Sequence, residues 1–203
     1  MTEGSARKAL SEVCARLYDR GLTVSAGGNM STRLDDFHIL ITPSGRNKGL
    51  IDPSDIVKVT MDGEIVGKGK PSIETAMHLA LYNKNVNINA VVHCHPLHCT
   101  VLAIRSEELR TDLTPEGVLL LGNVPMVKYS TPGTQELVDA VAEHSSSMAM
   151  LMERHGAVTQ GGSLEEAYNR MEELEFQARL QILAGDVPGL PQDEIDRIIG
   201  VLK

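Results

Sequence analysis

Residues 90–96 read Ala-Val-Val-His-Cys-His-Pro and decide how the middle of the chain folds. A short run of small and branched apolar residues predicts a buried strand, which Pro96 ends. Side chains two positions apart in a strand share a face, so His93 and His95 point the same way and Cys94 points away. The two imidazoles then lie close enough to hold one cation, the alternative being a hydrogen-bonded histidine pair at a strand end.

The sequence on either side of this strand alternates between two periodicities. A period of two indicates strands at 29–34, 38–42, 56–61, 64–66, 124–129 and 148–152. Helical spacing and capping residues indicate helices at 6–19, 72–83, 96–104, 134–143 and 163–183, with a short one after Pro191. This order predicts an α/β fold in which helices pack on a central mixed or antiparallel sheet.

The length and composition indicate one globular domain over residues 1–203. Apolar residues make up 42% of the chain and charged residues 23%, and no repeat or compositional break divides it. A chain of 203 residues can bury a core large enough to fold without disulfides or metal. Any bound metal is therefore expected to serve chemistry rather than to hold the fold together.

The composition also disfavours several classes of binding partner and indicates a cellular compartment. The net charge is −8 and no cluster of lysine and arginine is present, which disfavours nucleic acid. The chain has no Trp, two Phe and four Tyr, too few aromatic residues for base or sugar stacking. No apolar run approaches the length of about 20 residues that a membrane span needs. Three cysteines without disulfide-type spacing, Cys14, Cys94 and Cys99, favour a reducing cytoplasm.

A third histidine strengthens the metal interpretation. His155 follows the predicted strand 148–152 and precedes Gly156, where a side chain can be presented to the edge of a neighbouring strand. Three neutral imidazoles with an open coordination position are what a catalytic zinc or a similar divalent ion needs. Imidazole also accepts Mn2+, Co2+ or Fe2+, so the residue types alone do not choose the ion.

Three short polar loops form a second candidate site. Residues 26–29 read Ala-Gly-Gly-Asn, residues 42–45 read Thr-Pro-Ser-Gly, and residues 70–72 read Lys-Pro-Ser. Backbone N–H groups at glycine turns and at a helix start favour a phosphate group, so these loops would bind an anion if they converge. Taken singly, each loop is only a turn.

Glu74 is the candidate for proton transfer. It falls in the first turn of the helix that Ser72 is expected to cap, where a carboxylate interacts favourably with the helix dipole and needs no further role. Next to a divalent ion and a bound ketone, the same carboxylate can act as the base that moves a carbon-bound proton.

Taken together and in this order, the motifs resemble the class II aldolase/adducin family over nearly the whole chain. The motifs are Gly28-Asn29 with Ser31, residues 42–45, residues 70–72 with Glu74, residues 92–95, Pro132-Gly133-Thr134 and His155-Gly156. The resemblance implies a three-layer fold with a nine-stranded central sheet between helices on both sides. It also implies a homotetramer with active sites where subunits meet.

The resemblance further implies roles for individual residues. His93, His95 and His155 match zinc ligands, and Glu74 matches the catalytic acid/base. A phosphate-binding role falls on five further residues: Gly28, Asn29, Ser44, Gly45 and Ser72.

The implied activity is cleavage of a phosphorylated sugar. A ketose 1-phosphate, such as L-fuculose 1-phosphate, would give dihydroxyacetone phosphate and an aldehyde. On the aldehyde side the fucose-type enzymes use tyrosines, whereas this chain reads Leu113-Thr114-Pro115-Glu116. Glu116 is therefore a candidate second acid that reaches the site from a neighbouring subunit, the alternative being a solvated acid on an exposed turn.

Other activities within the same family remain open. One is dehydration of methylthioribulose 1-phosphate, for which an acid in the segment of Glu116 is also suitable. Epimerisation of L-ribulose 5-phosphate is less favoured, because that group typically carries Asp where this chain has Glu74. A noncatalytic adducin-like interaction module predicts loss of the metal-binding histidines, and all three histidines are present.

Overall fold

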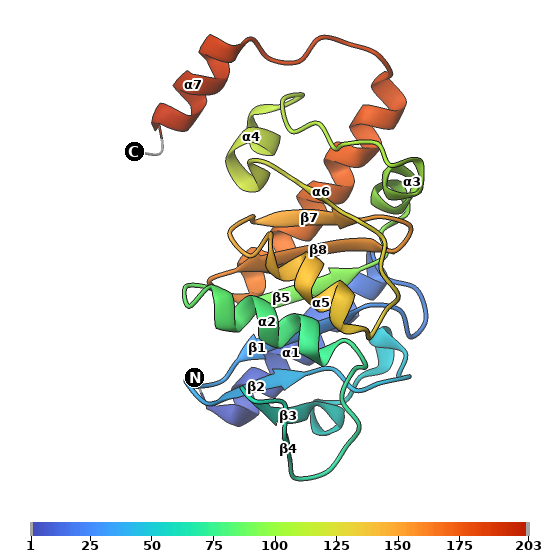
Figure 1. Ribbon diagram of the computed structural model, residues 1–203, viewed down its shortest axis with the longest axis vertical. Helices are drawn as coiled ribbons and strands as arrows, with labels where there is room; N and C mark the ends of the chain where they lie inside the picture. Colours follow the sequence, from blue (N-terminus) through green and yellow to red (C-terminus); the bar gives the residue numbers. More distant parts are fainter. Residues whose placement is uncertain (1, 202–203) are drawn as a thin grey trace.

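The computed structural model describes residues 2–201 and builds them around one sheet of eight strands (Figure 1). The strands are β1 (Asn29–Arg33), β2 (His38–Ile41), β3 (Val57–Thr60), β4 (Ile65–Val66), β5 (Ala90–Cys94), β6 (Met126–Val127), β7 (Ala149–Met152) and β8 (Gly156–Gly161). Their order across the sheet is β4-β3-β2-β1-β5-β8-β7-β6. The β6–β7 pair is parallel and the other pairs are antiparallel, so the sheet is mixed, as predicted.

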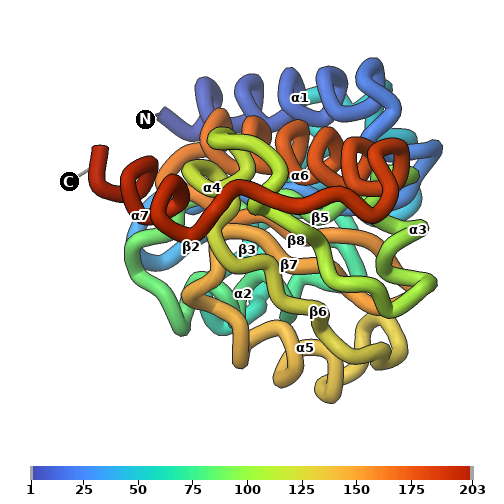
Figure 2. The backbone as a smooth tube through the Cα atoms, turned by 90° about the horizontal axis from the view of Figure 1, so that it is seen from above, coloured from blue at the N-terminus to red at the C-terminus, as the bar shows by residue number. Residues whose placement is uncertain are grey.

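Helices cover both faces of this sheet. They are α1 (Glu3–Asp19), α2 (Thr75–Lys84), α3 (Leu97–Arg105), α4 (Pro115–Leu121), α5 (Gln135–Ala142), α6 (Leu164–Ala184) and α7 (Gln192–Val201), with single turns η1 (Lys48–Leu50) and η2 (Pro53–Asp55). Figure 2 shows α1 and α6 on one side of the strands and α2 and α5 on the other. The predicted three-layer α/β fold is confirmed. Across residues 2–201, no helix has both the length and the apolar character needed to cross a bilayer.

Alternation along the strands divides the apolar side chains between two cores. Leu40 and Val92 belong to the core under α1 and α6, whereas Ile41 and Val91 belong to the core under α2 and α5. Neighbouring residues of a strand face opposite sides, which separates each pair in this way. His93 continues the face of Val91 and therefore points toward the α2 side.

The central position of β5 gathers distant parts of the chain around its end. β5 pairs with β1 on one side and with β8 on the other, so that His93 lies opposite both Asn29 and Val158. The residues just before β1 and just before β8 therefore meet beside the end of β5. Those residues include the glycine loop at 26–28 and His155.

Four details of the sequence-based description are wrong. No strand is predicted at residues 156–161, which form β8. Helix α2 begins at Thr75 with Glu74 at its N-cap, so Ser72 does not cap it. Residues 115–121 form helix α4 rather than a turn, because Thr114 caps it by accepting from Gly117 N and proline suits the first helical position. The sheet of residues 2–201 has eight strands rather than nine.

Candidate functional site

Three histidine side chains converge at the end of β5. His93 is in the strand and His95 follows it, while His155 lies in the turn between β7 and β8. The ring centroids are 4.9 Å apart for His93 and His95, 4.7 Å for His93 and His155, and 5.2 Å for His95 and His155. One ligating atom from each residue lies within 4.8 Å of the others, so the three could hold a metal ion.

The protonation of these imidazoles fits a divalent cation. His93 Nδ1 donates to the Ala157 carbonyl oxygen at 3.0 Å, so Nε2 of this ring is unprotonated and keeps its lone pair. This Nε2 atom lies 3.2 Å from His95 Nε2. Burial lowers the pKa of His93 well below its ordinary value, and it also lowers the pKa of His95 and of His155. Neutral imidazoles with one nitrogen held by a backbone carbonyl are the form that binds metals.

Glu74 lies beside this cluster. Its Oε2 is 3.4 Å from His93 Nε2 and its Oε1 is 3.6 Å from His155 Nε2. The residue is only 6% exposed, and Oε1 has no hydrogen-bond partner among the described residues. An unpartnered buried carboxylate oxygen is costly, so one that lies beside a histidine of the cluster fits a site completed by a cation and a substrate.

Asn29 is held by Glu74 and by a histidine that the sequence analysis left out of the site. Its Nδ2 donates to Glu74 Oε2 at 2.7 Å, and its Oδ1 is 2.5 Å from His78 Nε2. His78 is fully buried in α2. The sequence around His78 indicates no partner for it, and only the packing of α2 on β1 reveals its contact with the site.

The three polar loops converge. An isolated bridge joins Pro43 to Pro71, and it is flanked by hydrogen bonds from Ser44 N to the Lys70 oxygen and from Ser72 N to the Thr42 oxygen. The loops line one cavity of about 290 Å³ together with Glu74, His95 and His155. All five residues with a predicted phosphate-binding role line this cavity: Gly28, Asn29, Ser44, Gly45 and Ser72.

Gly28 shows why this loop needs glycine. Its φ is +69°, a left-handed conformation that L side chains rarely adopt, and a Cβ there would collide with the His93 carbonyl oxygen. The loop can therefore approach the end of β5 only where no side chain intervenes.

Lys48 is a cavity residue that the sequence analysis missed. It is 2% exposed, and its Nζ donates to the carbonyl oxygens of Ala26 at 2.8 Å and Arg46 at 3.1 Å. These two bonds tie the 26–28 loop to the 44–46 loop. Among the lining residues that the structure describes, Lys48 supplies the one lysine or arginine side chain. The sequence around Lys48 does not indicate that it is buried, because the loop before η1 has no regular alternation of apolar and polar residues.

Glu116 is not brought to this cavity within the described chain. It is exposed in the first turn of α4 and is not among the residues that line the cavity. The predicted role of Glu116 therefore depends on a neighbouring subunit.

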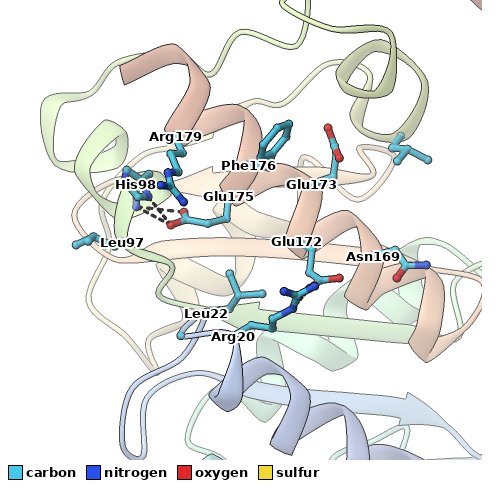
Figure 3. A pocket seen from close by; sticks show the side chains of 12 residues that line it. Arg20, Leu22, Leu97, His98, Asn169, Glu172, Glu173, Glu175, Phe176 and Arg179 are labelled. Atoms are coloured by element: carbon cyan, nitrogen blue, oxygen red, sulfur yellow. Dashed lines mark hydrogen bonds and ion pairs between the residues drawn. The ribbon is translucent and has the colours of Figure 1, made fainter. Parts of the chain in front are cut away.

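A larger cavity, of about 730 Å³, has none of the three clustered histidines in its lining (Figure 3). Residues of α3 and α6 make up most of its lining, together with residues 20–22 and Leu120 of α4, and its wall includes His98, which pairs with Glu175 at 2.7 Å. The His98 ring is thus engaged by a carboxylate outside the histidine cluster. The cavity holds no converging histidines, so the smaller cavity beside Glu74 is the candidate active site.

Comparison with known proteins gives one family over most of the chain. Residues 8–182 match the sequence profile described as Class II Aldolase and Adducin N-terminal domain. A 3-oxo-tetronate 4-phosphate decarboxylase of Escherichia coli K12 is 39% identical over 191 residues, which are 92% of this chain and 90% of that protein. An L-fuculose phosphate aldolase of Methanocaldococcus jannaschii is 36% identical over 177 residues, which are 87% of this chain and 96% of that protein.

Solved structures show the same likeness. The crystal structure of YgbL from Escherichia coli has a TM-score of 0.92 and 37% identity, and the match covers 98% of this chain and 99% of that chain. An L-fuculose 1-phosphate aldolase structure has a TM-score of 0.91 and 31% identity, and the match covers 100% and 98% of the two chains.

Proposed function

Because the chain belongs to the class II aldolase and adducin family, we propose that it is a metal-dependent lyase that releases dihydroxyacetone phosphate from a phosphorylated sugar. The observation that carries this proposal is the position of Glu74. Its Oε1 has no hydrogen-bond partner among the described residues and lies 3.6 Å from His155 Nε2, and Glu74 lines the same cavity as the glycine and serine loops. A ketone held at the cluster and a phosphate held at the loops would place a carbon between them, within reach of the carboxylate.

Different residues of the cavity have different proposed roles in this reaction. A divalent cation held by His93, His95 and His155 would supply Lewis acidity to the ketone oxygen. Backbone N–H groups of the loops and the hydroxyl groups of Ser44 and Ser72 bind the phosphate. Glu74 transfers the proton at the carbon next to the ketone.

Two leaving groups give the same product. Aldol cleavage of a ketose 1-phosphate breaks the bond between the carbon next to the ketone and the carbinol carbon beyond it, and the hydroxyl proton of that carbinol must be removed as the aldehyde leaves. Decarboxylation of 3-oxo-tetronate 4-phosphate breaks the bond to the carboxylate carbon and releases carbon dioxide. Both leave the electron pair on a carbon beside the ketone, and protonation of that carbon gives dihydroxyacetone phosphate.

The decarboxylation is the first reaction to test, because a relative named for it is 39% identical over 92% of this chain. Aldol cleavage of L-fuculose 1-phosphate or a related deoxy-ketose phosphate is the second candidate, supported by the M. jannaschii relative. Decarboxylation also needs no group to take a proton from the leaving fragment, and Glu74 is the one carboxylate among the described residues that line the cavity.

The test is a panel of 3-oxo-tetronate 4-phosphate and several ketose 1-phosphates, each assayed for dihydroxyacetone phosphate and for carbon dioxide with and without a chelator. Chelator-sensitive release of the triose phosphate from at least one substrate supports the proposal. No triose phosphate from any member of the panel, with metal supplied, would rule it out.

The substitution Glu116→Gln can distinguish aldol cleavage from decarboxylation. If the protein is an aldolase and Glu116 of a neighbouring subunit handles the hydroxyl proton, Glu116→Gln is expected to slow aldehyde release by about 100-fold. Exchange of the carbon-bound proton of dihydroxyacetone phosphate, which depends on Glu74, should not change. In a decarboxylase the substitution should leave carbon dioxide release at the wild-type rate. If Glu116→Gln retains the wild-type rates of both aldehyde release and proton exchange, Glu116 is a surface residue.

Lys48 is expected to contribute to phosphate affinity, because it is a buried cation that ties two of the loops together. Lys48→Met should raise the KM for dihydroxyacetone phosphate in the proton-exchange assay by roughly 10- to 100-fold, the worth of a hydrogen bond to a charged group. The KM for unphosphorylated dihydroxyacetone should change little. Arg46→Met is the matched control, since Arg46 is exposed and pairs with Asp55. An equal rise for both ketones in Lys48→Met would contradict a phosphate-specific role.

The metal and the assembly are also proposals. We propose Zn2+ as the ion because a three-imidazole set with an open position suits it, with Mn2+, Co2+ and Fe2+ as alternatives for metal analysis to decide. We propose a homotetramer with active sites at subunit interfaces. Exposed apolar side chains around the larger cavity, Leu97 and Phe176, are consistent with subunit contacts there (Figure 3). Sedimentation analysis would distinguish a tetramer from a monomer.

A cytoplasmic location is proposed from the cysteines. Cys14, Cys94 and Cys99 are free thiols and all three are buried. That residues 1–203 form a single domain stays a prediction.

A further inference from the structure

Five buried side chains form an unbroken hydrogen-bond chain that ends on Glu74. Tyr82 OH lies 2.8 Å from Ser31 Oγ, and Ser31 Oγ lies 2.6 Å from His78 Nδ1. His78 Nε2 lies 2.5 Å from Asn29 Oδ1, and Asn29 Nδ2 lies 2.7 Å from Glu74 Oε2. Each of the five residues is 6% exposed or less. β1 contributes two members, α2 contributes two, and Glu74 is the N-cap of α2.

The direction of each hydrogen bond follows from the carboxylate. An ionised carboxylate only accepts, so the Asn29 amide must turn its nitrogen toward Glu74 and its oxygen toward His78. The amide oxygen also only accepts, so His78 Nε2 carries the proton. Burial lowers the pKa of His78 to about 3, which keeps its ring neutral and leaves Nδ1 to accept from Ser31. Ser31 Oγ in turn accepts from Tyr82.

We propose that His78 is a positioning residue for proton transfer, acting through Asn29 to fix the orientation of the Glu74 carboxylate beside the histidine cluster. This proposal rests on the proposed function, in which Glu74 moves the proton, and adds the group that fixes its geometry. It also gives Asn29 a second task, because its amide oxygen and one N–H are committed to the chain.

A purely structural role does not account for this arrangement. The core under α2 and α5, to which Tyr82 belongs, is built mostly from aliphatic side chains, among them Leu81 and Val91. Apolar side chains would fill that space without the cost of burying an imidazole and two hydroxyl groups. Linked hydrogen bonds in a low-dielectric interior strengthen one another and favour one conformation, which is useful where a side chain must be held still.

The test uses proton exchange at dihydroxyacetone phosphate in deuterated buffer with the metal-loaded protein. His78→Leu removes the donor to Asn29, and we expect kcat to fall by about 10- to 100-fold, as for other groups that orient a site residue. The KM and the metal content should stay at the wild-type values. His78→Gln keeps an amide donor of similar reach and should recover a measurable part of kcat. A folded His78→Leu with wild-type kcat, or no difference between Leu and Gln, would overturn the proposal.

Two further variants guard against a simple loss of stability. Ser31→Ala is a smaller change that removes the donor to His78 Nδ1, and it should lower kcat in the same direction if His78→Leu does not fold. Leu10→Ala removes a fully buried side chain from the other core and serves as the matched control. We expect it to lower the melting temperature and leave kcat unchanged. If it lowers kcat as much as the network variants do, the network has no special role.

A measurement without turnover separates this proposal from the proposed function. Side-chain ¹⁵N NMR of the wild-type protein should show His78 as the neutral ring protonated at Nε2 between about pH 5 and pH 8, where an ordinary histidine titrates. A ring protonated at Nδ1, or one that titrates in this range, would overturn the hydrogen-bond chain whatever the enzyme does. Absence of proton exchange in the wild-type protein, with the Nε2 form observed, would instead count against the proposed function.

Discussion

Replacement of His93 by alanine is expected to abolish both divalent-cation binding and lyase activity. His93 contributes the most buried of the three imidazoles, with 0% exposure, and the Ala157 carbonyl already fixes its ring. Loss of a group that only orients a ligand typically costs 10- to 100-fold in metal affinity, so loss of the ligand itself should cost more than about 100-fold. Metal analysis after dialysis and the triose phosphate assay measure the two effects.

His98→Ala is the control for this change. His98 lies three residues beyond His95, and its ring pairs with Glu175 outside the cluster. It should keep full metal content and activity. Full occupancy in the His93 variant would remove that residue from the proposed ligand set, and the same criterion applies to His95 and His155.

The second large effect is expected at Glu74. Glu74→Gln keeps the size of the side chain and removes the base, so exchange of the carbon-bound proton of dihydroxyacetone phosphate should fall by about 100-fold or more. Metal content and the affinity for dihydroxyacetone phosphate should be retained, because neither the histidines nor the polar loops are altered. Proton NMR in deuterated buffer follows the exchange. An unchanged rate would leave Glu74 with only its position at the start of α2.

The parts of the fold that depend on local pattern could be predicted from the sequence. The run at 90–95 has the small and branched residues of a buried strand, and β5 occupies Ala90–Cys94. Ser163 caps α6 through Glu166 N, as its spacing indicates. At residue 116 the expectation of an exposed turn is wrong, because Thr114 and Pro115 suit the start of a helix as well as a turn.

Some residues of the candidate site could also be predicted from the sequence, and others could not. His93 and His95 share a face because of strand geometry, which the sequence alone implies. His78 could not be connected to them, since its partner Ser31 is 47 residues away and the bond depends on how α2 packs on β1. The hydrogen bonds of Lys48 likewise form only because the 26–28 and 44–46 loops lie side by side in the fold. Contacts of this kind come from the topology and leave no periodic signal.

For stability engineering, the two faces of the sheet are unequal. Tyr82 belongs to the core under α2 and α5, and so do residues on either side of His78 in α2, Met77 and Leu79. Repacking that layer would disturb the groups that orient the proposed base. The layer under α1 and α6 has aliphatic positions such as Leu10 and Leu17 that can be varied for thermal tolerance. A library confined to that layer is therefore the one to screen for gains in melting temperature at constant turnover.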